Sequence, residues 1–99
     1  MNKFLSTLGL CKRAGFVING FDSVKENIKK LKVILISNDI SLKTDENIRF
    51  YANKFEIRII KTKYSKDQLG RAINSKPVAI IGILDDGFSK LLINQEVDL

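Results

Sequence analysis

Aspartates that follow two predicted strands are the first side chains in this sequence that could carry chemistry. Asp39 comes after one strand, and Asp85-Asp86 come after another. Strand ends often build active sites in α/β proteins, and carboxylates gathered there can hold magnesium. However, Asp39 lies in a turn-rich sequence, and Asp85-Asp86-Gly87 is typical of a turn that caps a helix. The pattern favours these structural roles, and a metal-dependent hydrolase is the distant alternative.

The single cysteine, Cys11, precedes Lys12 and Arg13, whose charges would favour a reactive thiolate. Its helical register with Phe4 and Leu8 favours a buried structural thiol instead. The chain has no histidine, so the commonest general base and metal ligand is missing. Neither a Walker loop nor a dinucleotide fingerprint occurs. We therefore expect no catalytic residue, no metal and no cofactor.

Positive charge is concentrated in the first third of the chain. The net charge is +6, and residues 1–32 contain seven Lys or Arg against two acids. A basic patch suits a polyanionic partner, because neutralised phosphates release counterions. A well-solvated surface could have the same composition, so charge alone leaves nucleic-acid binding open.

Size and cysteine content indicate the class of protein. The 99 residues suit one domain, and 44% of them are hydrophobic, as in ordinary globular proteins. A lone cysteine forms no intramolecular disulfide, so nothing indicates an oxidising compartment. No apolar run approaches the roughly eighteen residues that cross a bilayer, and the N-terminus lacks signal-peptide features. We expect a single cytoplasmic domain over residues 1–99, with no membrane partner.

Helical and strand patterns alternate along the chain. Phe21, Val24, Ile28 and Leu31 keep helical spacing, whereas residues 33–36 form an unbroken apolar run, typical of a strand covered on both faces. Helices are predicted over residues 3–13, 21–31, 65–73, from Ser41 or Thr44 to 55, and after 87, with strands over 16–18, 33–36, 57–60 and 78–84. The aromatic residues Phe50, Tyr51 and Phe55 are assigned to the core. This order predicts a three-layer α/β/α sandwich with a four-stranded mixed sheet and about five helices.

Several ordered segments together resemble a known family. They are Leu8 to Gly15, Gly20 at a helix start, Lys32 to Asp39, Gln68 to Ile73, and Ala79-Ile80 with Asp85 to Lys90. The chain resembles the kink-turn RNA-binding ribosomal protein superfamily (the L7Ae, L30e and Gadd45 group), particularly its small bacterial YlxQ-like branch. The resemblance covers nearly the whole chain and implies the same sandwich fold. It also implies binding of structured RNA, with ribosomal RNA or the ribosome as partner and no small-molecule substrate.

The resemblance implies that the helix beginning at Gly20 grips the RNA. The family's usual motif there is Gly, any residue, Asn, Glu, two further residues and Lys. Here Gly20 is kept, and Asp22, Ser23 and Glu26 stand at the other three positions. The two acids repel phosphate, and Lys25 and Lys29 lie near enough on the predicted helix to compensate in part. The helix start would also offer backbone N–H groups to phosphate.

A second contact is implied in the loop before the last predicted strand. This loop contains Ser75, Lys76, Pro77 and Val78. The lysine would contact phosphate, and the Pro–Val pair would offer apolar contact to a flipped-out base. Lys66 falls on a basic position that faces RNA in relatives. The alternative for these residues is an exposed loop stiffened by its proline.

Two classes of function therefore remain. The first is non-catalytic binding of kink-turn-like RNA. The residues named above would contact the RNA, and Lys12 and Arg13 would add positive charge. The second is a protein-interaction adaptor that keeps the fold without specific RNA binding. The replaced motif positions favour the adaptor, whereas the basic loop favours RNA.

Overall fold

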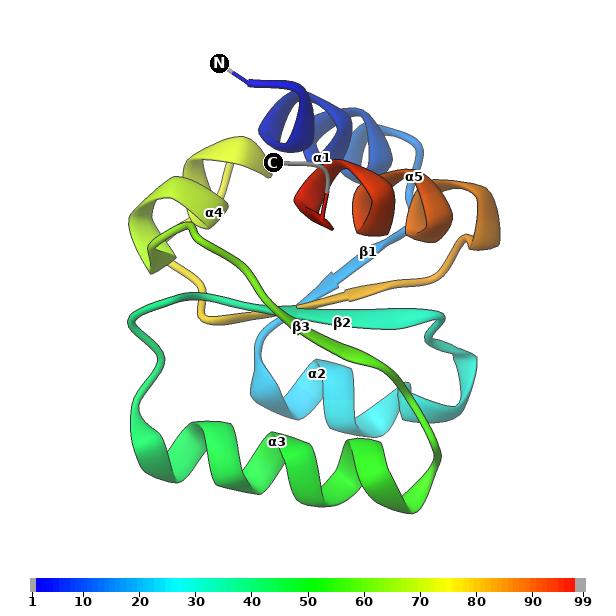
Figure 1. Ribbon diagram of the computed structural model, residues 1–99, viewed down its shortest axis with the longest axis vertical. Helices are drawn as coiled ribbons and strands as arrows, with labels where there is room; N and C mark the ends of the chain where they lie inside the picture. Colours follow the sequence, from blue (N-terminus) through cyan, green and yellow to red (C-terminus); the bar gives the residue numbers. More distant parts are fainter. Residues whose placement is uncertain (1, 98–99) are drawn as a thin grey trace.

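The computed structural model describes residues 2–97, in which helices and strands alternate (Figure 1). The α-helices are α1 (Lys3–Arg13), α2 (Phe21–Glu26), α3 (Leu42–Lys54), α4 (Lys66–Ala72) and α5 (Asp86–Val97), and a 3-10 turn, η1, covers Ile28–Lys30. The strands are β1 (Val17–Asn19), β2 (Val33–Ile36), β3 (Ile59–Lys61) and β4 (Ile80–Ile83). The predicted element order is confirmed.

The four strands form one mixed sheet in the order β1-β4-β2-β3. Strand β4 is antiparallel to both of its neighbours, whereas β2 and β3 are parallel. Helices α1, α4 and α5 cover one face of the sheet, and α2 and α3 cover the other (Figure 1). This is the expected α/β/α sandwich.

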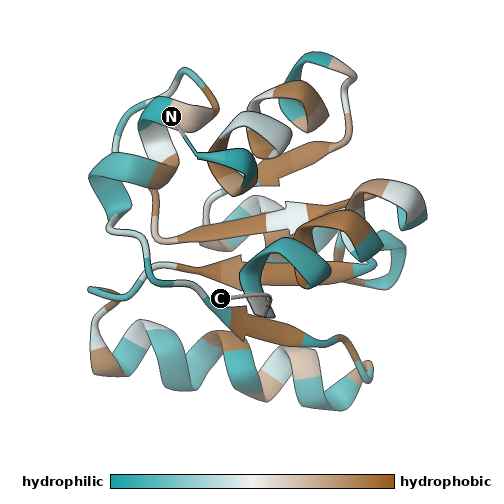
Figure 2. Cartoon of the chain, turned by 45° about the horizontal axis from the view of Figure 1, so that its top comes forward, coloured by the Kyte–Doolittle hydropathy of each residue, from teal (hydrophilic) through white to brown (hydrophobic). Residues whose placement is uncertain are grey.

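The core lies on both faces of the sheet, as the complete burial of β2 shows. Val33 and Leu35 face the layer of α1, α4 and α5, whereas Ile34 and Ile36 face α2 and α3. Figure 2 shows the apolar strands enclosed by helices in which hydrophilic and hydrophobic residues alternate. Full burial of such an aliphatic side chain contributes about 1.5–3 kcal/mol, so this strand specifies the sandwich strongly.

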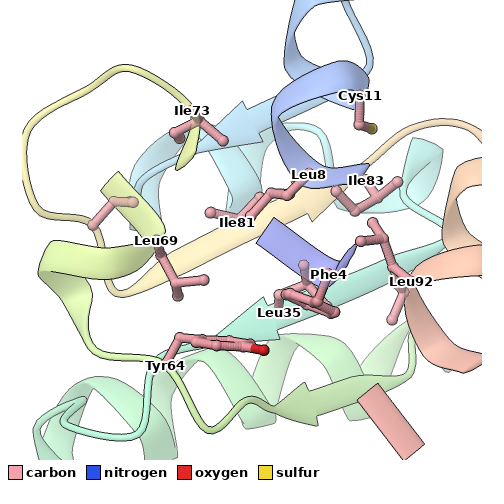
Figure 3. Close-up of a cluster of buried hydrophobic side chains, with 12 residues drawn as sticks. Phe4, Leu8, Cys11, Leu35, Tyr64, Leu69, Ile73, Ile81, Ile83 and Leu92 are labelled. Atoms are coloured by element: carbon pink, nitrogen blue, oxygen red, sulfur yellow. The ribbon is translucent and has the colours of Figure 1, made fainter. Parts of the chain in front are cut away.

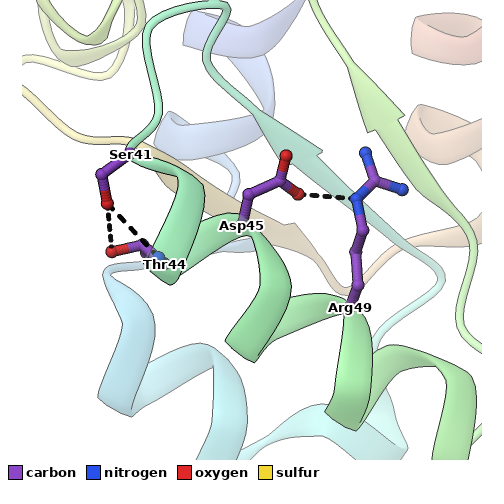
Figure 4. Close-up of polar contacts among 4 residues, drawn as sticks. All are labelled: Ser41, Thr44, Asp45 and Arg49. Carbon is purple, nitrogen blue, oxygen red and sulfur yellow. Dashed lines mark hydrogen bonds and ion pairs between the residues drawn. The ribbon is translucent and has the colours of Figure 1, made fainter.

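Side-chain caps fix where three helices begin. Asn2 Oδ1 accepts a hydrogen bond from the Leu5 N–H at 2.9 Å. Ser41, rather than Thr44, caps α3, since its hydroxyl oxygen accepts from the Thr44 N–H (Figure 4). Ser65 starts α4 with a reciprocal capping box. These caps set the positions of the loops that precede α3 and α4.

Three predicted elements had boundaries wrong by two residues or more, and one of them is the strand expected over residues 78–84, which begins at Ile80 and ends at Ile83. The helix expected over residues 21–31 ends at Glu26, because Asn27 leaves the helical conformation (φ −107°, ψ 14°) and its side-chain amide donates to the Ser23 carbonyl at 2.8 Å. The strand expected from residue 57 begins at Ile59. Glu56 has φ 56°, and the Ile57 N–H donates to the Ala52 carbonyl, so residues 56 and 57 close α3. In residues 2–97, no helix is long and apolar enough to span a bilayer.

Candidate nucleic-acid interface

The loops that carry most of the proposed RNA contacts gather at one end of the sheet, where three strands end and one begins. We call this end the sheet edge. The strand directions bring the ends of β1, β2 and β3 and the start of β4 to this edge, on the left in Figure 1. The Gly20 N–H donates to the Ile80 carbonyl at 2.9 Å, so the start of α2 lies beside the start of β4. The loop over residues 74–78 leads directly into this position. The fold thus brings together two segments that lie more than 50 residues apart in the sequence.

The 74–78 loop is held against α4. Its backbone N–H groups at Ser75 and Val78 donate to the carbonyls of Gly70 (2.8 Å) and Lys66 (3.1 Å). A Cβ added at Gly70 would lie only 2.9 Å from the Lys76 carbonyl carbon, so this close approach requires glycine. The loop is therefore preformed, and Lys66 is attached to it.

The side chains of this loop differ in what they offer to a ligand. Lys76 and Pro77 are exposed, as is Lys66, and Ser75 is half-buried. Val78 is only 8% exposed and packs into the core with α1, α4 and α5. The expectation that Val78 presents apolar surface to a base needs correction, because its side chain is directed inward. Pro77 supplies the exposed apolar surface of the loop.

The start of α2 lies at the same edge. Gly20 adopts φ 96°, a backbone conformation that side chains disfavour, and directs the chain from β1 into the helix. Asp22 and Ser23 are exposed on the first turn. Within residues 2–97, no side chain caps this helix start, so its first N–H groups are free of side-chain partners. Backbone donors and one carboxylate therefore share this surface.

Lys25 and Glu26 lie elsewhere. The Lys25 ammonium is 4.7 Å from the centre of the Tyr51 ring on α3, and both residues border a hollow between α2 and α3. The structure thus separates these two residues from the edge that holds Gly20, Lys66 and the 74–78 loop. Their distance from the loop follows from the direction of α2, which runs away from the sheet edge.

A second basic hollow adjoins the loop. Lys12 and Arg13, at the end of α1, line it together with Arg71 and Asn74. Its volume is about 530 Å³. Arg71 was not singled out in the sequence, although its place in the last turn of the helix before the loop could have indicated it. Positive charge therefore extends from Lys76 towards the end of α1.

The aspartates do not form a metal site. Asp39 follows β2 and Asp85 follows β4, and these strands are antiparallel, so the two carboxylates lie at opposite edges of the sheet. Asp39 Oδ1 accepts from the Lys66 N–H at 3.0 Å, and Asp85 Oδ2 accepts from the Phe88 N–H at 2.9 Å. Among the described residues, no group of three or more acidic, cysteine or histidine side chains is placed to hold a metal. Both aspartates have the structural roles that the sequence favoured.

Cys11 is fully buried in the core beside Leu8 and Ile83 (Figure 3). Burial, with a smaller effect of the Asp85 carboxylate, raises the pKa of its thiol to about 11. We expect the native protein to react with a thiol reagent at pH 8 at least about 100-fold more slowly than the urea-unfolded chain, because little thiolate is present. Labelling followed by absorbance tests this. Equal rates in both states would contradict a structural thiol.

Glu96 on α5 should make the stability of the protein depend on pH. It is 9% exposed, and one carboxylate oxygen accepts from the Lys63 N–H at 3.0 Å, while the other has no hydrogen-bond partner among residues 2–97. Burial raises the pKa of Glu96, against the opposing effects of the Lys63 N–H and ammonium. The folded state therefore binds the proton more tightly than the unfolded state. This contribution to stability is present at low pH and is lost as pH rises through the folded pKa.

Replacing Glu96 with Gln should keep the acceptor for Lys63 and remove the buried charge. We expect the variant to be more stable than the native protein at pH 7, by up to about 1 kcal/mol. The difference should disappear below about pH 4, where the native carboxyl is protonated in both states. Urea unfolding at several pH values measures it. A variant less stable at pH 7 would show that the carboxylate is stabilising.

Comparison with known proteins gives two kinds of match. The model of the ribosomal protein L7Ae/L30e/S12e/Gadd45 family matches residues 2–93. No curated protein sequence matches the chain. Among solved structures, a protein of unknown function from Bacillus halodurans shares 27% identity at a TM-score of 0.89, with 100% of each chain covered. A 15.5 kD RNA-binding protein from Giardia lamblia has a TM-score of 0.77 at 15% identity, covering 95% of this chain and 82% of its own.

Proposed function

Because the chain belongs to the ribosomal protein L7Ae/L30e/S12e/Gadd45 family, we propose that it binds structured RNA of the kink-turn type and catalyses no reaction. The observation that carries this proposal is the sheet edge where the start of α2 meets the preformed 74–78 loop. Two rigid segments that meet at an edge can contact the two arms of a bent RNA. We expect a straight duplex, which lacks the bend, to fit this edge less well.

Each segment would have its own role. Lys76 and Lys66 neutralise backbone phosphates, and the exposed ring of Pro77 packs on an unstacked base. Ser75 contributes through the loop's shape, since its hydroxyl donates to the Lys76 carbonyl at 2.8 Å. The backbone of Val78 fixes the loop on Lys66 while its side chain anchors the core.

The start of α2 would contribute less than it does in a full family motif. Asp22 and Ser23 replace an amide and a carboxylate, so their hydrogen-bonding pattern towards purine edges differs. Ser23 is a donor and an acceptor, whereas Asp22 only accepts and repels phosphate. Glu26 replaces the cation and is one helical turn further along α2. Recognition would therefore depend on RNA shape and on phosphates at the loop.

We further propose that a ribosomal or ribosome-associated RNA in the cytoplasm is the partner. The family contains ribosomal proteins, and the lone, buried Cys11 is compatible with a reducing compartment. No small-molecule substrate is expected for such a role. One domain over residues 1–99 would be sufficient for it.

Binding to a kink-turn RNA and to a straight duplex of equal length tests the proposal. We expect tighter binding to the kink-turn at every salt concentration in a titration series, with affinity for both falling as salt rises. Fluorescence anisotropy with end-labelled RNAs would measure both constants. Equal affinities would indicate nonspecific attraction to basic surface and would contradict the proposal.

The alternative function is a protein-interaction adaptor. Leu42, at the first position of α3, is 76% exposed close to the same edge, and such a side chain suits a protein contact. An adaptor would bind neither RNA. It would also lose its partner when Leu42 is replaced by a polar residue, whereas RNA binding through the 74–78 loop would be unchanged.

A further inference from the structure

A groove lies between α2 with η1 on one side and α3 on the other. Its volume is about 450 Å³. It is lined by Lys25, Glu26, Asn27, Ile28, Lys29, Lys30, Tyr51, Lys54 and Phe55. Helix α2 ends at Glu26 and the chain continues through η1, whose residues face the second half of α3 across the groove. The groove is separate from the 74–78 loop.

Lysines lie over aromatic rings along this groove. The Lys25 ammonium is 4.7 Å from the Tyr51 ring centre, and those of Lys29 and Lys54 are 5.6 and 5.7 Å from the Phe55 ring centre. These contacts hold cations beside aromatic surface. The rings and the charges are therefore arranged together before any ligand arrives.

Phe50 adds an exposed ring next to the groove. Its side chain is 64% exposed and meets the Tyr51 ring edge-on, with 5.2 Å between ring centres. The assignment of Phe50 to the core was wrong, because it lies on α3 about 200° around the helix from the buried Ile48. Most of this ring is left free by its contact with Tyr51, so it can stack on a ligand.

The charge of the groove selects the class of ligand. Four lysines (Lys25, Lys29, Lys30 and Lys54) line it against one glutamate, Glu26. Cations that follow a groove with exposed aromatic rings are typical of single-stranded nucleic-acid binding, in which bases stack on rings and lysines contact phosphates. An acidic peptide would use the lysines but would leave Phe50 without a partner. The combination therefore favours unpaired nucleotides.

We propose that this groove binds a single-stranded segment of RNA that continues from the structured RNA at the sheet edge. The inference rests on the proposed function for the source of that strand. Helix α2 connects the two surfaces, since it starts at Gly20 on the edge and ends at the groove. A strand that leaves the bent RNA can follow α2, with a base on Phe50 and phosphates on Lys29 and Lys54.

Three labelled RNAs test this inference by anisotropy: a blunt kink-turn, the same kink-turn with an eight-nucleotide uridine extension, and free octauridylate. We expect the extension to tighten binding by about tenfold. Phe50→Ala should reduce this gain at least about fivefold, in line with the loss of one stacked base. Lys29→Glu combined with Lys54→Glu should abolish it. None of these variants should change affinity for the blunt RNA, and all three residues are exposed, so folding should be unaffected.

Tyrosine fluorescence gives a second measurement. The chain has no tryptophan and two tyrosines, of which Tyr64 is 6% exposed in the opposite layer. Quenching on addition of octauridylate should therefore come from Tyr51 and should be absent in Tyr51→Phe. Lys90→Glu, on α5, makes the same change of net charge as Lys29→Glu or Lys54→Glu alone, and it should behave like the native protein.

The outcomes separate this inference from the proposed function. If the extension adds nothing, or if the gain survives the groove variants, the inference is overturned while kink-turn binding stands. If octauridylate binds through the groove but the kink-turn is not preferred, the groove is supported and the proposed function fails. Binding of polyglutamate that depends on Lys29 and Lys54 but not on Phe50, without any gain from the extension, would overturn the inference in favour of an acidic protein partner.

Discussion

Replacing Gly70 with alanine is expected to destabilise the protein and weaken its binding to kink-turn RNA. The added Cβ would collide with the carbonyl group of Lys76 and lie 3.0 Å from the Pro77 Cα, and both neighbours are backbone. The 74–78 loop must then move away from α4. Forcing atoms into a packed region costs about 1–3 kcal/mol, which exceeds the gain of up to about 1 kcal/mol from helix propensity.

Affinity for kink-turn RNA should fall because the same movement displaces Lys76 and Pro77 from the sheet edge. We expect at least a tenfold loss of kink-turn affinity, measured under conditions where the variant is fully folded by circular dichroism. Urea unfolding measures the stability. Gly87→Ala is the matched control, since its Cβ would meet only a side-chain oxygen, Asp85 Oδ2, at 3.2 Å, and no backbone atom. If the two variants behaved alike in stability and binding, close packing at Gly70 would not be what fixes the loop.

Local signals made most of the fold predictable. The apolar run of β2 indicated a strand buried on both faces, and all four of its residues are buried. Ser65 indicated a helix start, and the structure confirms its capping box. Such signals act within a few residues of one another, so a single sequence contains them.

Boundaries that depend on tertiary contacts were not predictable. The apolar spacing of Val24, Ile28 and Leu31 is equally satisfied by a continuous helix and by α2 followed by η1, because both bury the same side chains. The choice between them rests on the backbone at Asn27. Similarly, Ile57 has the composition of a strand residue, but its N–H closes the end of α3.

The position of the candidate site was predictable, but the directions of its side chains were less so. The resemblance indicated the start of α2, Lys66 and the 74–78 loop, and the structure brings all of these to one edge. The direction of a side chain depends on what covers it in three dimensions. The sequence therefore could not show that Val78 is directed into the core, that Lys25 lies over Tyr51, or that Phe50 is exposed.

Reversing the charge of Lys76 should cause a large loss of RNA binding. Lys76 is exposed on a loop that hydrogen bonds hold to α4, so its ammonium has a defined position against an RNA backbone. Lys76→Glu removes one phosphate contact and places a carboxylate against the phosphates. We expect kink-turn affinity to fall at least about tenfold. The slope of log affinity against log salt should become shallower by about 1, because one fewer counterion is released.

The control for this variant is Lys90→Glu, which makes the same change of net charge on α5. Lys90 is exposed and pairs with Asp86 at 3.0 Å, and a surface pair of this kind contributes little to stability. If binding depended only on net charge, both variants would lose affinity equally. A loss confined to Lys76→Glu would locate the RNA at the sheet edge, because only that position lies on the 74–78 loop. Undiminished binding by Lys76→Glu would exclude this edge as the RNA contact.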